Sequence, residues 1–209
     1  MPKQVDPHER RTLLADALLR VAATRGLMDV SLRHVAAEAG VTAGMVQHYF
    51  RTKDEMMVFA LDVVSARVQA RLEADPTMHD GPRALVRALL VQLLPVDDDR
   101  VLEGRVAIAF HAYAASRPAV ATRLREDTRG MRAMIAEQIR ARGHSALDPE
   151  QAATGLLSLV EGLAVHVLGG HVTADHAVAT LDAHLGMAFG HVSVPGRPDD
   201  PEHSRAEHR

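Results

Sequence analysis

Helix start and stop signals recur along this chain, and their spacing restricts the fold more than any other feature of the sequence. Asp6 precedes Pro7, which places an N-cap side chain before a proline at the first helical position. Gly26 supplies a stop, and similar start signals recur at Thr52 and Asp148. No segment alternates apolar and polar residues in the way that is typical of a half-buried strand. The pattern therefore predicts an all-α chain.

The signals divide the chain into about nine expected helices of unequal length. These helices cover residues 7–25, 32–39, 43–49, 53–74, 82–94, 98–115, 117–142, 149–168 and 174–190. Because the first three are short, we expect them to form one compact N-terminal domain over residues 1–53. A larger helical domain is expected over 54–191. The remainder, 192–209, is polar and proline-rich, which is typical of a disordered tail.

Composition and charge exclude several classes of protein. The chain has 209 residues and no cysteine, which excludes disulfide scaffolds, thiolate zinc sites and cysteine nucleophiles and is consistent with a cytoplasmic protein. No apolar run approaches the roughly 18 residues of a membrane span, so we expect no membrane partner. Residues 1–53 hold 8 Lys and Arg against 5 Asp and Glu, whereas residues 54–209 hold 16 against 22. Residues 1–53 are therefore mildly basic, as phosphate contact requires, and residues 54–209, the body of the protein, are acidic.

The stretch from Ser31 to Lys53 carries the strongest functional signal. Two short expected helices are separated here by a tight turn at Gly40. Small apolar residues occupy the positions where the helices would cross, namely Val35, Ala36, Ala39, Val41 and Val46. This is the helix-turn-helix pattern, in which the second helix enters the major groove of DNA. The pattern predicts that the N-terminal domain binds double-stranded DNA.

The same stretch resembles the TetR family of bacterial transcriptional regulators, whose signature runs T-V-x-x-I-A-x-x-A-G-V-S-x-G-x-L-Y-x-Y-F-x-x-K-x-x-L. The matching residues are Ser31, Leu32, Val35, Ala36, Ala39, Gly40, Val41, Thr42, Gly44, Val46, His48, Tyr49, Phe50, Lys53 and Met56. The segment from Leu93 to Phe110 is similar to the choline-responsive repressor branch. The resemblance implies a homodimeric repressor that binds a near-palindromic operator and is released by a small-molecule effector. It implies no cofactor and no catalytic activity.

The resemblance also implies two kinds of DNA contact. Facing the bases would be Thr42, Ala43, Gly44, Met45 and Gln47. Meeting phosphates would be Ser31, Arg33, His48, Tyr49 and Lys53. The family usually has Tyr where this chain has Gln47, and Gln reads adenine through N6 and N7, so Gln47 is expected to take over base readout. The alternatives are a core role for Tyr49, an inert surface role for His48 and Arg33, and a capping role alone for Lys53.

The expected helix over 149–168 is apolar nearly all round, which leaves it no water-facing side. One side should pack on the core of its own subunit and the other on a partner. Small residues such as Gly155, Ser158 and Gly162 permit close approach of helices. We infer a homodimer in which the last two helices meet their copies as a four-helix bundle, an arrangement that the family resemblance also implies. The expected interface residues are Leu156, Leu159, Leu163, Val167, Val178, Leu181 and Leu185, with burial in their own core as the alternative.

A pocket for the effector is expected among the helices of the larger domain. Its apolar candidates are Leu89, Leu93, Val106, Phe110, Tyr113, Met131, Met134, Ile135, Leu157 and Val160, and ordinary core packing is the alternative for each. Polar residues in apolar surroundings are more telling, and these are His111, Glu161 and His166. A buried carboxylate needs a partner, so Glu161 either bonds a neighbouring side chain or meets a cationic or hydroxyl group of the ligand.

Other classes of protein fit the sequence less well. The late histidines at positions 166, 171, 176, 184 and 191 never have the spacing of four that places two imidazoles at one metal, so we expect no metal site. A small all-helical enzyme could use Glu161 and a histidine, but the chain contains no P-loop, dinucleotide glycine fingerprint, G-x-S-x-G or H-E-x-x-H. A ligand-independent helical adaptor remains a further alternative. An architectural DNA-bound protein would have a strongly basic body.

Overall fold

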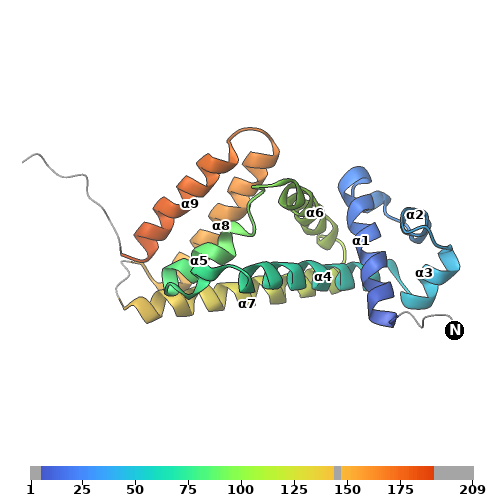
Figure 1. Ribbon diagram of the computed structural model, residues 1–209, viewed down its shortest axis with the longest axis horizontal. Helices are drawn as coiled ribbons and strands as arrows, with labels where there is room; N and C mark the ends of the chain where they lie inside the picture. Colours follow the sequence, from blue (N-terminus) through green and yellow to red (C-terminus); the bar gives the residue numbers. More distant parts are fainter. Residues whose placement is uncertain (1–5, 144–146, 191–209) are drawn as a thin grey trace, which may run out of the picture.

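The computed structural model describes residues 6–143 and 147–190, and these residues form helices and no strands (Figure 1). In chain order the elements are α1 Pro7–Arg25, η1 Leu27–Asp29, α2 Leu32–Glu38, α3 Ala43–Tyr49, α4 Lys53–Glu73, η2 Pro76–His79, α5 Pro82–Val91, α6 Asp98–Ala114, α7 Pro118–Arg142, α8 Pro149–Leu168 and α9 Ala174–Ala188. The all-α fold and the nine expected α-helices are thus confirmed within this part of the chain. The expected disordered tail, 192–209, lies outside the described residues.

Side-chain caps fix the helix starts where the sequence placed them. The carboxylate of Asp6 accepts a hydrogen bond from the backbone N–H of His8 at 2.9 Å, and the hydroxyl of Thr52 accepts one from Glu55 at 3.0 Å. Asp148 caps α8 in the same way. One end differs from expectation, because α5 stops at Val91 instead of near residue 94. The chain tightens there into bonds between residues three apart before it reaches a proline, which disfavours helical backbone in the residue that precedes it.

One apolar core joins the N-terminal helices to α6. Its fully buried members include Leu18 of α1, Val46 of α3, Met56 of α4 and Phe110 of α6. In Figure 1, α6 lies between α1 and α8, and α4 runs past it to contact α1 as well. Movement of α6 would therefore disturb the packing of the helix-turn-helix unit directly.

A second core lies at the far end of the molecule. The long helices α4 and α7 run side by side, and α5, α8 and α9 pack at the end away from α1 (Figure 1). Ile135, Val160, Leu181 and Phe189 are among the buried residues of this core. Ion pairs join helices around it. The pair between Arg71 of α4 and Glu103 of α6 is bidentate at 2.9 and 2.7 Å, the geometry in which a guanidinium orients a carboxylate best.

Candidate DNA-binding helix, dimer surface and effector cavity

The turn between α2 and α3 holds α3 in a fixed orientation. Gly40 has a φ of +66°, a left-handed backbone conformation that favours glycine over residues with a side chain. The hydroxyl of Thr42 then caps α3 by accepting a hydrogen bond from the N–H of Met45 at 3.2 Å. Val46 and Phe50 are fully buried beneath the helix. A capped start and a buried inner face leave α3 rigid, with its other face free.

The residues expected to face bases lie mostly on that free face. Thr42, Gly44, Met45 and Gln47 are exposed, whereas Ala43 is half-buried. Met45 is one of the few large apolar side chains on the surface, at 37% exposed. An apolar side chain beside a polar one is the combination that base edges and thymine methyl groups can meet. The five base contacts stay predictions, and the orientation of α3 favours them.

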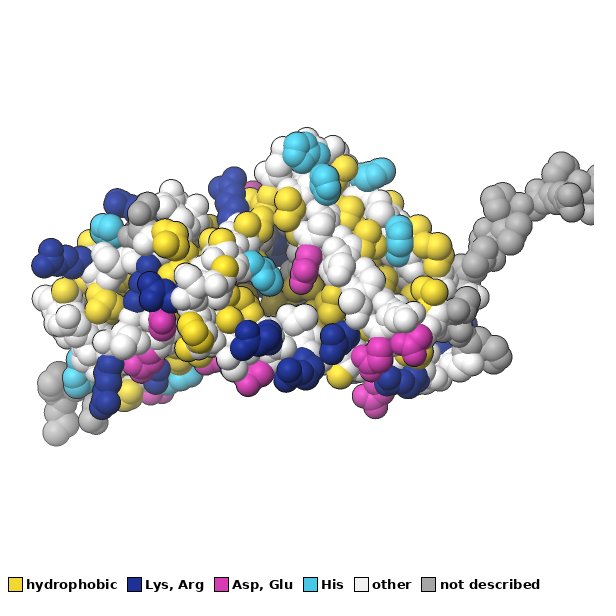
Figure 2. Space-filling model, turned by 180° about the vertical axis from the view of Figure 1, so that it is seen from behind, with side chains coloured by type: hydrophobic (Ala, Val, Ile, Leu, Met, Phe, Trp, Pro, Cys, Tyr) yellow, Lys and Arg dark blue, Asp and Glu magenta, His cyan; other side chains and the backbone are white. Residues whose placement is uncertain are grey.

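The residues expected to meet phosphates are exposed or half-buried. Arg33 and His48 are exposed, and Ser31 and Tyr49 are half-buried. The hydroxyl of Ser31 already accepts a hydrogen bond from the N–H of His34 as the cap of α2, at 3.2 Å. The rings of His48 and Tyr49 meet edge to face, with their centroids 5.1 Å apart. Figure 2 shows Lys and Arg side chains spread over this end of the molecule.

Lys53 points into the protein in this structure. Its ammonium group donates hydrogen bonds to the backbone oxygens of Leu27 at 2.7 Å and Met28 at 3.3 Å, both in η1. It also lies 5.0 Å from the centroid of the Tyr113 ring. A phosphate contact by Lys53 stays a prediction, but the side chain has a structural role that the sequence did not indicate. That role depends on η1, a short 3₁₀-helix that no local signal predicted.

Tyr113 of α6 is buried at the junction with α4. Its hydroxyl donates a hydrogen bond to Oδ1 of Asp54 at 2.6 Å, and the side chain is 2% exposed. Burial, together with the hydrogen bond to the Asp54 carboxylate, raises the pKa of Tyr113 to about 12. The guanidinium of Arg117 also lies over the Tyr113 ring, 5.4 Å from its centroid. The phenol is therefore neutral at physiological pH and serves as a donor that links α6 to the first turn of α4.

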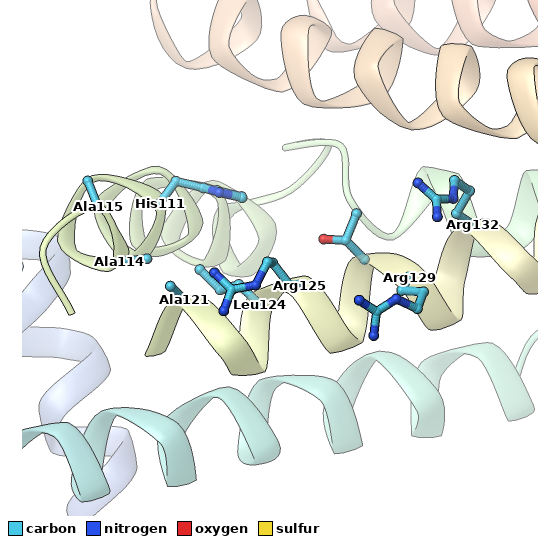
Figure 3. Close-up of a pocket in the computed structure, with 9 residues that line it drawn as sticks. His111, Ala114, Ala115, Ala121, Leu124, Arg125, Arg129 and Arg132 are labelled. Carbon is cyan, nitrogen blue, oxygen red and sulfur yellow. The ribbon is translucent and has the colours of Figure 1, made fainter. Parts of the chain in front are cut away.

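Hollows open onto the surface beside α6. A cavity of about 600 Å³ lies between α6 and α7 (Figure 3) and is lined by His111, Ala114, Ala115, Ala121, Leu124, Arg125, Thr128, Arg129 and Arg132. A smaller one of about 330 Å³ lies among α1, α4 and α6, and its lining includes Asp16, Arg67, Arg71, Glu103 and Val106. In Figure 2, arginine side chains gather over α7 beneath a hollow in that face.

The structure brings only a few of the expected ligand residues to these hollows. His111 lines the larger cavity and Val106 the smaller one. Most of the apolar candidates are core residues instead, which was the alternative left open for each. Phe110 and Tyr113 are buried in the core shared with the N-terminal helices. The second core buries Leu89, Ile135, Leu157 and Val160, and Leu93, Met131 and Met134 are half-buried against it. Glu161 and His166 are exposed on α8. The expectation that Glu161 is a buried carboxylate is therefore wrong for the single subunit.

The outward face of α8 differs from the one the sequence suggested. Among the expected interface residues, Leu156, Leu163, Leu181 and Leu185 are buried in the core of their own subunit, and Leu159, Val167 and Val178 are half-buried. The exposed face instead carries Gly155, Ser158, Gly162 and Val165. By length and composition α8 could cross a membrane, because its most apolar stretch of 18 residues has a mean hydropathy of 1.4. Only 28% of this stretch is buried within the subunit. An apolar helix covered on one side only is what a subunit interface requires.

The family follows from comparison with known proteins. A sequence model described as bacterial regulatory proteins of the tetR family matches residues 14–58. Another, described as the C-terminal part of BetI-type transcriptional repressors, matches residues 82–190, more than half of the chain. The chain belongs to the TetR family of bacterial transcriptional regulators. The resemblance identified in the sequence is thereby confirmed.

Individual members of the family are similar along most of their length. The transcriptional regulator PksA of Bacillus subtilis is 34% identical over 174 residues, which cover 80% of this chain and 83% of PksA. The crystal structure of a transcriptional regulator from Rhodococcus sp. Rha1 is 34% identical, covering 89% of this chain and 97% of its own, with a TM-score of 0.78. A regulator from Saccharomonospora viridis, solved in complex with choline, is 25% identical with a TM-score of 0.70, covering 84% and 95%.

In this TetR-family regulator, sequence reasoning missed residues that join α6 to the start of α4 and residues that line the larger cavity. Asp54 lies in the first turn of the helix that the start signal at Thr52 predicts, and its carboxylate accepts a hydrogen bond from the Tyr113 hydroxyl. Arg125, Arg129 and Arg132 were not expected at a ligand site, although their spacing of four and three places them on one face of a helix. That spacing was the signal available in the sequence. For Asp54 no local signal existed, because its partner lies 59 residues away.

Proposed function

We propose that this protein is a dimeric repressor that binds a near-palindromic operator through α3 and releases it when a small molecule binds in the body. The observation that carries the proposal is the pairing of a rigidly capped α3, exposed on its outer face, with a core that α1 to α3 share with α6. Family membership supports the same activity. The exposed residues of α3 would reach base edges in the major groove, and α2 would lie near the backbone.

Dimerisation is supported by the outward face of α8. Gly155 and Gly162 both face open space, since a Cβ atom added at either position would meet no neighbouring atom within 4 Å. Glycine inside a helix costs about 1 kcal/mol relative to alanine, which is offset where a second helix must approach closely. Val165 on the same face is 50% exposed, as is Met187 of α9. Two copies related by a twofold axis would cover these residues and present two α3 helices to successive major grooves.

Effector response is supported by the position of α6. The end of this helix lines the cavity with His111, Ala114 and Ala115, and it carries Tyr113, which bonds to α4. A ligand that binds better to one position of α6 than to another would shift the population of the DNA-binding arrangement. Ligand affinity and operator affinity must then oppose each other by the same factor.

Selection of bound duplexes from a random library, followed by fluorescence anisotropy, tests the proposal. We expect one near-palindromic sequence to emerge and to bind two chains. Its affinity should exceed that of random duplex by a factor on the order of 10³ or more. Equal affinity for all duplexes at a fixed salt concentration would contradict the proposal, as would an operator that binds a single chain.

A further inference from the structure

The cavity between α6 and α7 has one strongly cationic wall. Arg125, Arg129 and Arg132 of α7 line it, and Figure 3 shows their side chains along the helix that faces α6. The remaining lining consists of small or apolar side chains, one threonine and His111. No Asp or Glu is among the lining residues. This concentration of positive charge stands out because residues 54–209 as a whole hold more acidic than basic side chains.

The arginines of α7 fall into two groups by their partners. Away from the cavity, Arg123 pairs with Asp62 at 2.6 Å and Arg140 pairs with Glu150 at 2.7 Å. At the cavity, Arg125 donates to the hydroxyl of Thr122 at 2.8 Å and forms no ion pair among the residues that the structure describes.

The other two cavity arginines are also weakly paired. Nε of Arg132 lies 3.6 Å from Oε2 of Glu150, while Arg140 binds the other oxygen of the same carboxylate more closely, at 2.7 Å. Arg129 forms neither an ion pair nor a hydrogen bond through its side chain within residues 6–143 and 147–190. The guanidinium groups that face the cavity are therefore the ones whose donors remain available to a ligand.

We infer that this cavity binds a small organic anion, with its carboxylate or phosphate held by Arg129 and Arg125 and its apolar part against α6. Guanidinium groups suit such head groups because their planar N–H donors can bond two oxygens at once. Ala114, Ala115 and Leu124 supply an apolar surface for the rest of the molecule. A volume of about 600 Å³ is within the range of small-molecule sites.

The inferred charge sets this protein apart from a choline-binding relative. A quaternary ammonium group would meet three guanidinium groups and no lining carboxylate, so the cavity should reject it. Binding of the anion does not depend on the proposed function, whereas its effect on DNA does. The lining residues Ala114 and Ala115 follow Tyr113 directly, so an occupant contacts the turn of α6 that bonds to Asp54.

Isothermal titration calorimetry of the full chain tests the inference with four probes that share an unbranched eight-carbon chain and differ in head group: octanoate, octyl phosphate, octyltrimethylammonium and octanol. We expect an anionic probe to bind at least about tenfold more tightly than the cation and the alcohol. The tighter of the two anions identifies the head group as carboxylate or phosphate. Failure of both anions to bind, or equal binding of the cation, would overturn the inference.

A matched pair of variants locates the site. Arg129→Gln should weaken binding of the anionic probe roughly tenfold. Arg142→Gln removes the same charge from the same helix at an exposed position outside the cavity, and it should leave binding unchanged. Since both side chains are exposed, neither change should prevent folding. Equal binding by Arg129→Gln and wild type would overturn the proposed site.

Operator binding by the same proteins separates this inference from the proposed function. If the wild type binds its operator but neither anionic probe binds the protein, the anion site is wrong and the repressor stands. If octanoate or octyl phosphate binds in an Arg129-dependent way but no duplex is preferred, the site stands and the repressor is wrong. Release of the operator by the anionic probe from wild type, and not from Arg129→Gln, supports both.

Discussion

The hydroxyl of Tyr113, near the end of α6, donates a hydrogen bond to the carboxylate of Asp54 in the first turn of α4 at 2.6 Å. Lys53 directly precedes Asp54, and its ammonium group lies 5.0 Å from the centroid of the Tyr113 ring. The same ammonium group donates a hydrogen bond to the backbone oxygen of Leu27 in η1. Two adjacent residues therefore tie α6 to the base of the helix-turn-helix unit. A change in the position of α6 would reach that unit through these bonds as well as through the shared core.

Replacement of Tyr113 by phenylalanine tests the bond to Asp54 while keeping the ring. We expect the free energy of unfolding to fall by about 1–3 kcal/mol, because a part-buried hydrogen bond to a charged group is lost. Tyr49→Phe is the matched control, since Tyr49 is half-buried and its hydroxyl forms no hydrogen bond among the described residues. Denaturant unfolding of both variants gives the comparison. An equal effect of the two substitutions would count against a special role for Tyr113.

The same pair of proteins should differ in pH dependence. The pKa of Tyr113 is raised to about 12 in the folded protein, whereas that of an unfolded tyrosine is about 10. Its contribution to stability is therefore fully present below pH 10 and is lost as the pH rises from about 10 to about 12. The difference in free energy of unfolding between wild type and Tyr113→Phe should shrink over this window. A difference that stays constant from pH 8 to pH 12 would rule out the neutral hydroxyl as the stabilising form.

Lys53 is expected to matter for folding as well as for DNA. Lys53→Ala should lower the free energy of unfolding by about 1–3 kcal/mol, since the backbone oxygen of Leu27 loses a charged donor. Arg33→Ala, at an exposed position of α2, should leave stability nearly unchanged while weakening DNA binding. Thermal unfolding and anisotropy measured on both variants separate the two effects. If Lys53→Ala were as stable as wild type and bound DNA more weakly, the Lys53 ammonium group would contact phosphate without stabilising the fold.

The dimer prediction concerns the outward face of α8. Val165→Arg should produce monomers and weaken operator binding, because it adds charge to an exposed apolar position on the proposed interface. Ile108→Arg, at an exposed position of α6, should remain dimeric. Leu181→Arg should unfold the protein, since Leu181 is fully buried in its own subunit. Sedimentation velocity distinguishes the three, and a wild type that is monomeric at micromolar concentration would remove the basis of the prediction.

Local features of the sequence predicted the helices well, because their causes lie within a few residues of one another. Thr52 caps α4 by bonding a residue three positions away, and the sequence shows both members of the pair. The partners of Lys53 and Tyr113 lie 26 and 59 residues away, so no local pattern could indicate them. Glu161 was misplaced for a different reason. Its neighbours along α8 are apolar on all sides, and the sequence does not say which side the subunit itself covers.

The most direct test of the account is the response of operator binding to Gln47→Ala and Arg33→Gln, measured against a scrambled duplex over a range of salt concentrations. Gln47→Ala should cost roughly 1–3 kcal/mol per half-site on the operator, with little change on scrambled DNA or in the salt slope. Arg33→Gln should weaken binding to both duplexes by a similar factor and reduce the slope of log affinity against log salt by about one per half-site. If Gln47→Ala instead weakened binding to both duplexes equally and left the preference for the operator intact, α3 would not be the helix that reads the sequence.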